Sequence, residues 1–520
     1  MRVNGKQLLC LAGLVACLLF SPASIPLCGA ASSVNIPLNR DLYDDMSFWA
    51  AEGLIGSQLA SIRPFTGSEV GRQLLEAMDR CRAGKTQSAA CRDIQNRYTK
   101  LFDGEIAEAQ SPDSAAAFYF KPVESFAVTY SYLDGPFSTF NNEGLPENKG
   151  HNLTLRLQTQ ARLGRVFSVF VEPLFVFNQN LAYGEDGRRH DTRLHKGYAK
   201  LTLFNLELQV GRDSLWWGPG YHGSLLMSTN ARPFDMIKLS NPEPVLLPWI
   251  LSYLGPAQFT LLFSQLNDTR TGEELANPFL YGMRLGLKPH PWLEVGASHL
   301  VLFGGPGRRH LSAQDVVKIL YSNKNRDRTN LDSNQQFAAD IALTVPNLGR
   351  YLYVIDGIKL YGEIGGEDTG TPPDRRAYIV GAALFKPFGL ERAALRGEYA
   401  MLSPDSVPNA WYNHRYYPMR FHDRVFGHHA GSDAEDLFVE WSHSLDPFFY
   451  KLSYDWEKSG VKLQNHPQKK HQVFVEAGYR FNAHAQISLR YGFEDIRNLN
   501  HIENSRQRNH LLGLEAALFF

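Results

Sequence analysis

The chain has 520 residues and carries 53 Lys and Arg against 53 Asp and Glu, so its formal net charge is zero. This balance does not suit a basic nucleic-acid-binding protein, and a hydrophobic content of 44% does not suit a helical membrane protein. Aromatic residues make up 12% of the chain and glycine contributes 43 residues, a bias that favours strands, tight turns and interfacial rings over helix bundles.

Residues 1–30 have the pattern of a secretory signal peptide. A basic start precedes an apolar run from Leu8 to Phe20, and small residues follow near Ala30. The mature chain is therefore expected to begin near Ala31; a lipoprotein is the alternative, because Leu14 to Cys17 has the form of a lipobox. After this region no segment approaches the roughly 20 apolar residues of a spanning helix, so any membrane span must be made of strands.

Cleavage of the signal would leave two cysteines, Cys81 and Cys91, which enclose the short polar segment RAGKTQSAA. In an oxidising compartment this arrangement favours one disulfide, with two free thiols as the alternative.

Residues 31–112 are predicted to form a small helical domain. Thr66 and Glu69 resemble a capping box at the start of one helix. The segment NRDLYDDMSFWAAEGLI places a set of residues near one face of another: Leu42, Met46, Trp49 and Gly53. The polar stretch DGEIAEAQSPDSAA then ends the domain.

Residues 113–520 are predicted to form an all-β transmembrane barrel. From Phe118 onward, apolar and polar residues alternate in short runs such as LTLRLQTQARL, VFVEAGYRF and ISLRYGFE. A soluble sandwich also alternates, so alternation alone does not distinguish the two folds.

Three further features favour an outer-membrane barrel. Short links such as Gly164-Arg165 and Phe204-Asn205 alternate with long polar ones such as DGPFSTFNNEGLPENKGHN. Aromatic residues cluster near the ends of the runs, as in interfacial girdles. The final run, HLLGLEAALFF, has one apolar face and ends in Phe520, which resembles the terminal-aromatic pattern of proteins inserted by the barrel-assembly machinery.

The strand count is about 18. A first division gives about 17 runs, but it puts the long connection NDTRTGEELAN on the short-turn side. Treating VLLPWILSYL (Val245 to Leu254) as a strand that turns at Gly255-Pro256 restores the alternation, although Pro248 makes this strand irregular. The loop from Ser214 to about Pro244 then lies on the external side or folds into the lumen.

A barrel of this width encloses a channel unless something fills it. The predicted inward face carries both charges, which suits cross-linked walls or a neutral polar ligand better than steering of one ion type. The inward basic residues are Arg156, Arg162, Lys200, Arg284, Lys359, Arg396, Arg480 and Arg490, and the acidic ones are Glu172, Glu207, Glu294, Glu363, Glu398, Glu476, Glu494 and Glu515.

The stretch GRDSLWWGPGYHGSLLMSTNARPF, from Gly211 to Phe234, places two adjacent indoles in a glycine-flanked loop. Sugars present apolar C–H faces that stack on indoles and hydroxyls that bond to Arg, Asp and Asn. The candidate glycan-binding residues here are Arg212, Asp213, Trp216, Trp217, Tyr221, His222 and Asn230. The alternative is a loop that packs its indoles inside the barrel and occludes it.

The segment WYNHRYYPMRF adds a second aromatic and polar cluster with the candidates Trp411, Tyr412 and Arg415, for which interfacial anchoring is the alternative.

Two other chemistries are weaker hypotheses. His222 and Ser224 have the His-x-Ser spacing of outer-membrane phospholipase A, but the residues that follow differ from that family. The segment RFHDRVFGHHAGSD gathers side chains that suit a cation, although solvated loop polarity explains them as well: His422, Asp423, His428, His429 and Asp433. We therefore predict no catalytic residue, no resident metal and no cofactor.

With these residues in view, the chain resembles the capsule assembly Wzi family of outer-membrane proteins. The resemblance rests on VNIPLNRDLYDDMSFWAAEGLIGSQLASIRPFTGSEVGRQL near the mature N-terminus and on GRDSLWWGPGYHGSLLMSTNARP in the tryptophan loop. It implies a barrel of 18 strands, with an N-terminal helical bundle that closes the periplasmic mouth. It also implies a lectin-like, non-enzymatic role in holding secreted polysaccharide.

The predicted function is surface anchoring of capsular or exopolysaccharide in the outer membrane of a Gram-negative bacterium, and a porin or substrate-specific channel is the alternative. The expected partners are polysaccharide, outer-membrane lipid and the polysaccharide export machinery, with no nucleic acid. Residues 31–112 would then be a periplasmic plug and the long loops would lie at the cell surface.

Overall fold

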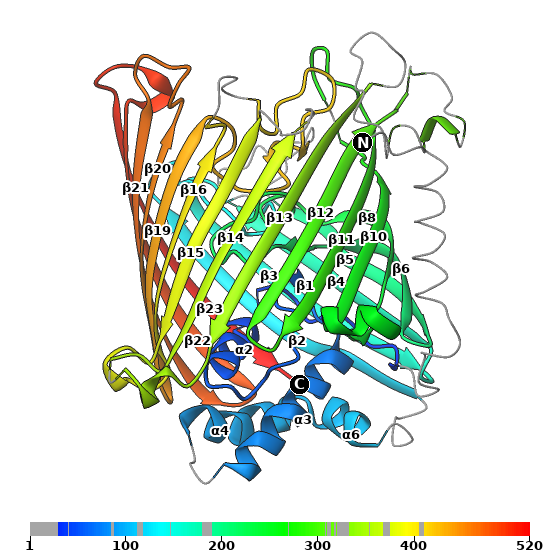
Figure 1. The fold of residues 1–520 in the computed structure, drawn as a ribbon. Coiled ribbons are helices and arrows are strands. Elements are labelled where there is room, and N and C mark those ends of the chain that lie inside the picture. Colours follow the sequence, from blue (N-terminus) through cyan, green and yellow to red (C-terminus); the bar gives the residue numbers. More distant parts are fainter. Residues whose placement is uncertain are drawn as a thin grey trace.

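The chain folds into one wide β-barrel with a group of helices at one end and long loops at the other (Figure 1). The computed structural model describes residues 30–520 apart from 40, 85–87, 112–117, 146, 179–189, 269, 307, 309–311, 313, 317–318, 320–331, 353, 368–374 and 405–409. Nearly all of the expected signal peptide, and the expected domain boundary at 112 and 113, lie outside the described residues. Among the described helices, none is long and apolar enough to cross a membrane.

Eighteen of the described strands pair antiparallel with their neighbours, and β23 pairs with β2 to close the barrel, which confirms the predicted architecture. The first nine are β2 (Phe118–Leu133), β3 (Gly150–Leu163), β4 (Phe167–Asn178), β5 (His190–Leu203), β6 (Leu206–Asp213), β8 (Phe234–Ser240), β10 (Pro256–Gln265), β11 (Phe279–His290) and β12 (Leu293–Phe303). The others are β13 (Ser333–Val345), β14 (Gly357–Glu367), β15 (Arg376–Phe385), β16 (Ala393–Leu402), β19 (Ala434–Leu445), β20 (Phe448–Ser459), β21 (Gln468–Asn482), β22 (Ala485–Arg497) and β23 (Arg506–Phe519).

Side chains on successive strand residues point to opposite faces of the barrel wall. In β23, Leu512, Leu514 and Leu518 are exposed on the outside, while Leu511 and Ala517 are buried. This follows from the two-residue period of a pleated strand. The outer face is therefore apolar and the inner face largely polar, as in barrels that cross a membrane.

The predicted strand from Val245 to Leu254 is wrong. Only Val245–Leu246 pairs, as the short strand β9, and Trp249–Leu254 forms the 3-10 helix η4. Pro248 has no amide hydrogen to donate to a ladder, which ends the strand. The strand that restores the alternation of short and long links is β8, which pairs with β6 and β10.

Strand β8 has the sequence FDMIKLS, in which Phe234, Met236 and Lys238 are buried and Ile237 is exposed on the outside. The loop that carries the two tryptophans is therefore residues 214–233, shorter than predicted.

The helices of residues 42–110 lie together at one end of the barrel (Figure 1). They are α2 (Leu42–Ala51), α3 (Gly67–Ala83), α4 (Ala89–Asp93), the π-helix η2 (Ile94–Tyr98), α5 (Thr99–Leu101) and α6 (Asp103–Gln110). Leu42, Met46 and Trp49 are buried on one face of α2 as expected, and the Thr66 hydroxyl caps α3 by accepting a hydrogen bond of 3.2 Å from the Glu69 amide. The segment between α2 and α3 consists mainly of turns and bends and contains the short strand β1 (Ile62–Arg63).

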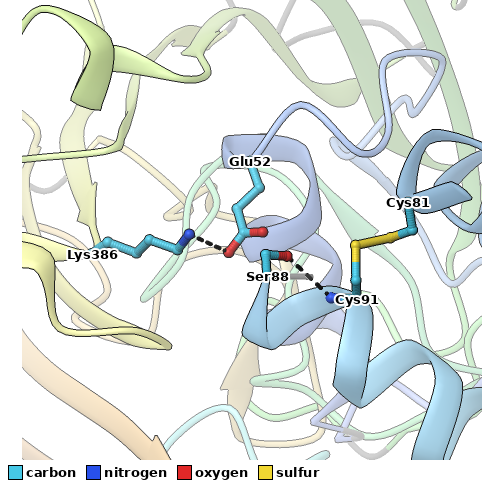
Figure 2. Close-up of a disulfide and its surroundings, with 5 residues drawn as sticks. All are labelled: Glu52, Cys81, Ser88, Cys91 and Lys386. Carbon is cyan, nitrogen blue, oxygen red and sulfur yellow. Dashed lines mark hydrogen bonds and ion pairs between the residues drawn. A yellow bond between two sulfur atoms is a disulfide. The ribbon is translucent and has the colours of Figure 1, made fainter. Parts of the chain in front are cut away.

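Contacts across the junction attach the helices to the barrel. Phe48 of α2 packs edge-on against Phe385 of β15, with ring centroids 5.1 Å apart. Glu52 and Lys386 form an ion pair of 2.9 Å, drawn in Figure 2. Beside it, Cys81 and Cys91 are joined in a disulfide, the pairing favoured by the sequence, which ties α3 to α4 (Figure 2).

The lumen wall is cross-linked by charge pairs, as the balanced inward face suggests. Arg284 and Asp340 lie 2.6 Å apart on β11 and β13, and Lys200 and Glu207 lie 3.1 Å apart on β5 and β6. All four side chains are almost completely buried. Such pairs are needed because a single buried charge without its partner is strongly destabilising.

Arg284→Met should lower stability by about 3–5 kcal/mol, because it leaves Asp340 buried without its partner. Arg284→Met with Asp340→Leu should recover most of that loss. The measurement is the temperature at which the folded, fast-migrating barrel band converts on a heat-modifiability gel. Equal losses in the single and double variants would contradict the pairing argument.

Candidate functional site

Two long loops fold into the lumen near its loop end and pack on each other. We call residues 214–233 and 410–433 together the lid. Trp217, Leu225, Trp411 and Tyr412 are almost completely buried in one apolar cluster of the lid and the adjoining wall. The lid therefore shares one hydrophobic core with an apolar part of the barrel wall.

Hydrogen bonds join the two halves of the lid. The Tyr412 hydroxyl donates to the Leu225 carbonyl at 2.6 Å and accepts from the His428 amide at 2.7 Å. Ser228 donates to the Gly427 carbonyl at 2.6 Å, and the side chain of Asn230 donates to the Val425 carbonyl at 3.1 Å. Burial raises the pKa of the Tyr412 phenol, so the hydroxyl stays protonated and able to donate.

Carboxylates of the barrel wall hold the backbone of the first lid segment. Glu398 on β16 accepts from the amides of Tyr221, His222 and Gly223 at 2.7, 3.2 and 2.7 Å. Glu363 on β14 accepts from the Leu225 amide at 3.2 Å. The sequence placed both glutamates in the lumen, but it gave no indication that they bind this loop.

The glycines of Trp-Trp-Gly-Pro-Gly allow the close approach that these bonds require. Gly218 has a φ of 128°, and an added Cβ would lie 2.8 Å from the Glu363 carboxylate. A Cβ on Gly220 would overlap the Gly223 carbonyl. Side chains are excluded at both positions by conformation or contact, so the motif fits the loop against the wall.

The lid also contacts the helical domain through the lumen. Trp216 and Trp217 form the short strand β7, which pairs with β1 (Ile62–Arg63). The Gly218 amide donates to the Ser61 carbonyl at 2.9 Å, and the Arg63 guanidinium lies 5.1 Å from the Trp216 ring. The two ends of the barrel are thus joined by a strip of backbone pairing.

A polar cavity of about 250 Å³ lies between the helical domain and the lid. It is lined by residues from three regions, including Asp44, Arg63, Trp216, Tyr221, Lys359 and Lys451. Trp216 is 6% exposed and lines this cavity.

Most of the predicted glycan-binding residues are buried inside the protein. Six of them are lid residues with little or no exposed surface: Trp216, Trp217, His222, Asn230, Trp411 and Tyr412. Tyr221 is half-buried and donates to Glu440 at 2.7 Å. Neither indole of the tryptophan pair is accessible to a sugar from outside in this conformation.

The other three predicted residues lie outside the buried part of the lid. Asp213 is buried and accepts from the side chain of Asn35 at 2.7 Å. Its neighbour Arg212 points to the outer face, where it pairs with Asp235 at 2.8 Å, because adjacent strand residues alternate. Arg415 is 64% exposed and forms an ion pair with Glu273.

Around Arg415 the lid presents an exposed aromatic and charged patch. The guanidinium carbons of Arg308 and Arg415 lie 5.1 and 5.3 Å from the Tyr416 ring centroid. Asn413 beside them is exposed. Arg308 and Glu273 were not candidates from the sequence, since their loops are distant from Arg415 along the chain.

The phospholipase hypothesis finds little geometric support, and the residues of the cation hypothesis are only partly brought together. The Ser224 hydroxyl donates to the Trp217 carbonyl, while Nε2 of His222 lies 3.7 Å from Asp436, so the two side chains face different partners. His428 and His429 of the cation hypothesis stack with ring centroids 4.6 Å apart, but Asp423 does not join them. Asp423 is fully exposed, whereas His429 is buried with its Nε2 3.3 Å from Asp436.

Comparison with known proteins identifies the family. Residues 129–511 match the family model for capsule assembly protein Wzi. The chain belongs to this family. This result confirms the resemblance seen in the sequence.

Two individual proteins show how far the similarity extends. The chain is 28% identical over 187 residues to an uncharacterized 55.8 kDa protein in the cps region of Klebsiella pneumoniae. This match spans about a third of each protein, 35% of both lengths. The fold is similar to that of Wzi of Escherichia coli, an outer-membrane protein of group 1 capsule assembly described as a carbohydrate-binding β-barrel. That similarity has a TM-score of 0.66 at 18% identity and covers 94% of this chain and 99% of the other.

Glu398→Ala should loosen the lid, because it removes the acceptor of three buried amides at a cost of about 1–3 kcal/mol each. We expect the wild-type protein to be silent in planar bilayers and the variant to show bursts of conductance. Glu515→Ala is the control, since its carboxylate bonds to Thr129 of the wall. A variant as silent as the wild type would contradict the anchoring role.

Proposed function

We propose that this Wzi-family protein binds polysaccharide at the loop end of its barrel and anchors capsular or exopolysaccharide at the cell surface without catalysis. The observation that carries the proposal is the lid itself, whose two segments fold into the lumen at the loop end and pack on each other. The carbohydrate binding described for the Escherichia coli relative supports it.

The proposed orientation puts the helical domain, residues 31–112, in the periplasm and the lid at the cell surface of a Gram-negative bacterium. The apolar outer face would contact outer-membrane lipid. Exposed aromatic residues at the helical end, such as Trp249, Trp292 and Tyr351, suit the membrane interface. The polysaccharide export machinery is a further proposed partner, reached through either exposed end.

Within this proposal the two aromatic clusters have different tasks. The patch of Asn413, Arg415 and Tyr416 offers an aromatic ring and hydrogen-bonding groups to a sugar from outside. The buried Trp216 and Trp217 would instead act as the occluder that keeps the lid in place. The porin alternative requires a continuous water path, which lid and helical domain would both have to leave open.

Asn413→Ala with Arg415→Ala should reduce polysaccharide binding several-fold, because it removes exposed hydrogen-bonding groups beside Tyr416. The measurement is retention of labelled surface polysaccharide from the source strain by purified protein. Arg506→Ala is the matched control, as it removes another exposed arginine that is paired with an acid, Asp495. Equal retention by all three proteins would exclude this patch as the binding site.

Replacing Trp216 and Trp217 with Ala should disorder the lid, since loss of one buried Trp costs about 3–5 kcal/mol. We expect bilayer conductance to rise and polysaccharide retention to fall together. Lost retention with an unchanged, silent barrel would instead show direct contact between the indoles and sugar.

A further inference from the structure

We propose that the protein holds a divalent metal ion of the Zn²⁺ type in a buried site formed by His222, His429, Asp436 and Asp455. The two histidines come from the two segments of the lid, and the aspartates come from β19 and β20 of the wall. One ligand atom from each residue lies within 4.8 Å of every other. Imidazole nitrogens and carboxylate oxygens are ligands that zinc accepts in tetrahedral sites.

The distances already approach those of a metal site. Nε2 of His429 lies 3.3 Å from Oδ2 of Asp436, and Nε2 of His222 lies 3.7 and 3.8 Å from Oδ1 of Asp436 and Oδ1 of Asp455. Ligand atoms about 2.0–2.1 Å from a tetrahedral zinc are separated by about 3.3 Å. Small rotations of these side chains are therefore sufficient to close the site.

The polar atoms of this cluster are buried and unsatisfied. Both oxygens of Asp436 and Asp455, Nε2 of His222 and both ring nitrogens of His429 lack a hydrogen-bond partner in the part of the chain that the structure describes. The side chains are only 1–4% exposed. Two adjacent buried carboxylates repel each other, and a cation between them would remove this cost.

One cation among the neighbouring groups acts on both aspartates, but it already has a carboxylate partner of its own. The nearby Lys470 pairs with Glu457 at 2.8 Å.

Two aromatic rings orient the imidazoles. Phe438 stacks on His222 at 3.9 Å, and Phe140 stacks on His429 at 4.2 Å.

A second cluster in the lumen differs from the proposed site in the charges that surround it. Glu143, Glu172 and His195 also lie within ligand distance of one another. Here, however, Lys196 pairs with Glu143, and the Arg156 guanidinium lies 3.8 Å from Glu172. This cluster has its own positive charges, so it needs no metal ion and provides a control site.

A bound ion would join both lid segments to two wall strands at one point. It would hold the lid closed whatever ligand the outer surface binds, so this inference does not depend on the proposed function.

The test is metal analysis of the untagged full chain in detergent. The protein is stripped with a chelating resin, incubated with Zn²⁺, desalted and measured by inductively coupled plasma mass spectrometry. We expect about one zinc per chain in the wild type and in Glu143→Gln, and less than about a fifth of that in Asp436→Asn with Asp455→Asn. Wild-type zinc no higher than in the double variant would overturn the proposal.

Stability and spectroscopy provide readouts that do not rely on comparing the zinc content of the variants. Zinc should raise the unfolding temperature of the wild type but not of the double variant. Without metal, the double variant should be the more stable of the two, because two neutral amides replace two repelling carboxylates. Wild-type protein loaded with Co²⁺ should show the intense visible bands of tetrahedral cobalt. Their absence would mean that a shared proton, not a metal, relieves the pair.

Discussion

The structure depends on the need to satisfy the polar inner face of a wide barrel. Because strand residues alternate, most strands send polar side chains into a lumen too broad for them to meet across it. Wall pairs such as Arg284 with Asp340 satisfy part of this face. The remaining carboxylates, Glu363 and Glu398 among them, bind the backbone of loops that fold inward. The wall therefore determines the position of the lid as much as the lid's own sequence does.

The same requirement couples the two ends of the barrel. Strand β7 of the lid pairs with β1 of the N-terminal segment, so displacement of either element leaves backbone groups unpaired inside the lumen. Lys200 on the wall likewise donates to the Ser33 carbonyl and the Asn35 side chain of this segment. A protein that opened at one end would therefore have to rearrange at the other, which argues against an independent gate at either end.

The sequence predicted the features that depend on local pattern. Strand alternation, the Thr66 cap and the pairing of Cys81 with Cys91 each involve near neighbours along the chain. The sequence-based prediction failed where a proline or a long-range pairing determines which segment becomes a strand. The apolar run at Val245 was a more obvious strand than the mixed sequence of β8, yet Pro248 interrupts the first while β6 and β10 pair with the second.

The candidate site was only partly predictable for the same reason, because exposure is set by tertiary packing. Trp217 and Arg415 were equal candidates from composition, but one is buried and the other is 64% exposed. The family motif around Trp216 also marks the residues that close the lid against Glu363 and Glu398. A motif can therefore report the architecture that a family shares; under the proposed function, the choice of sugar is then left to exposed residues outside it. Differences in polysaccharide between members should then follow the surface loops rather than the tryptophan pair.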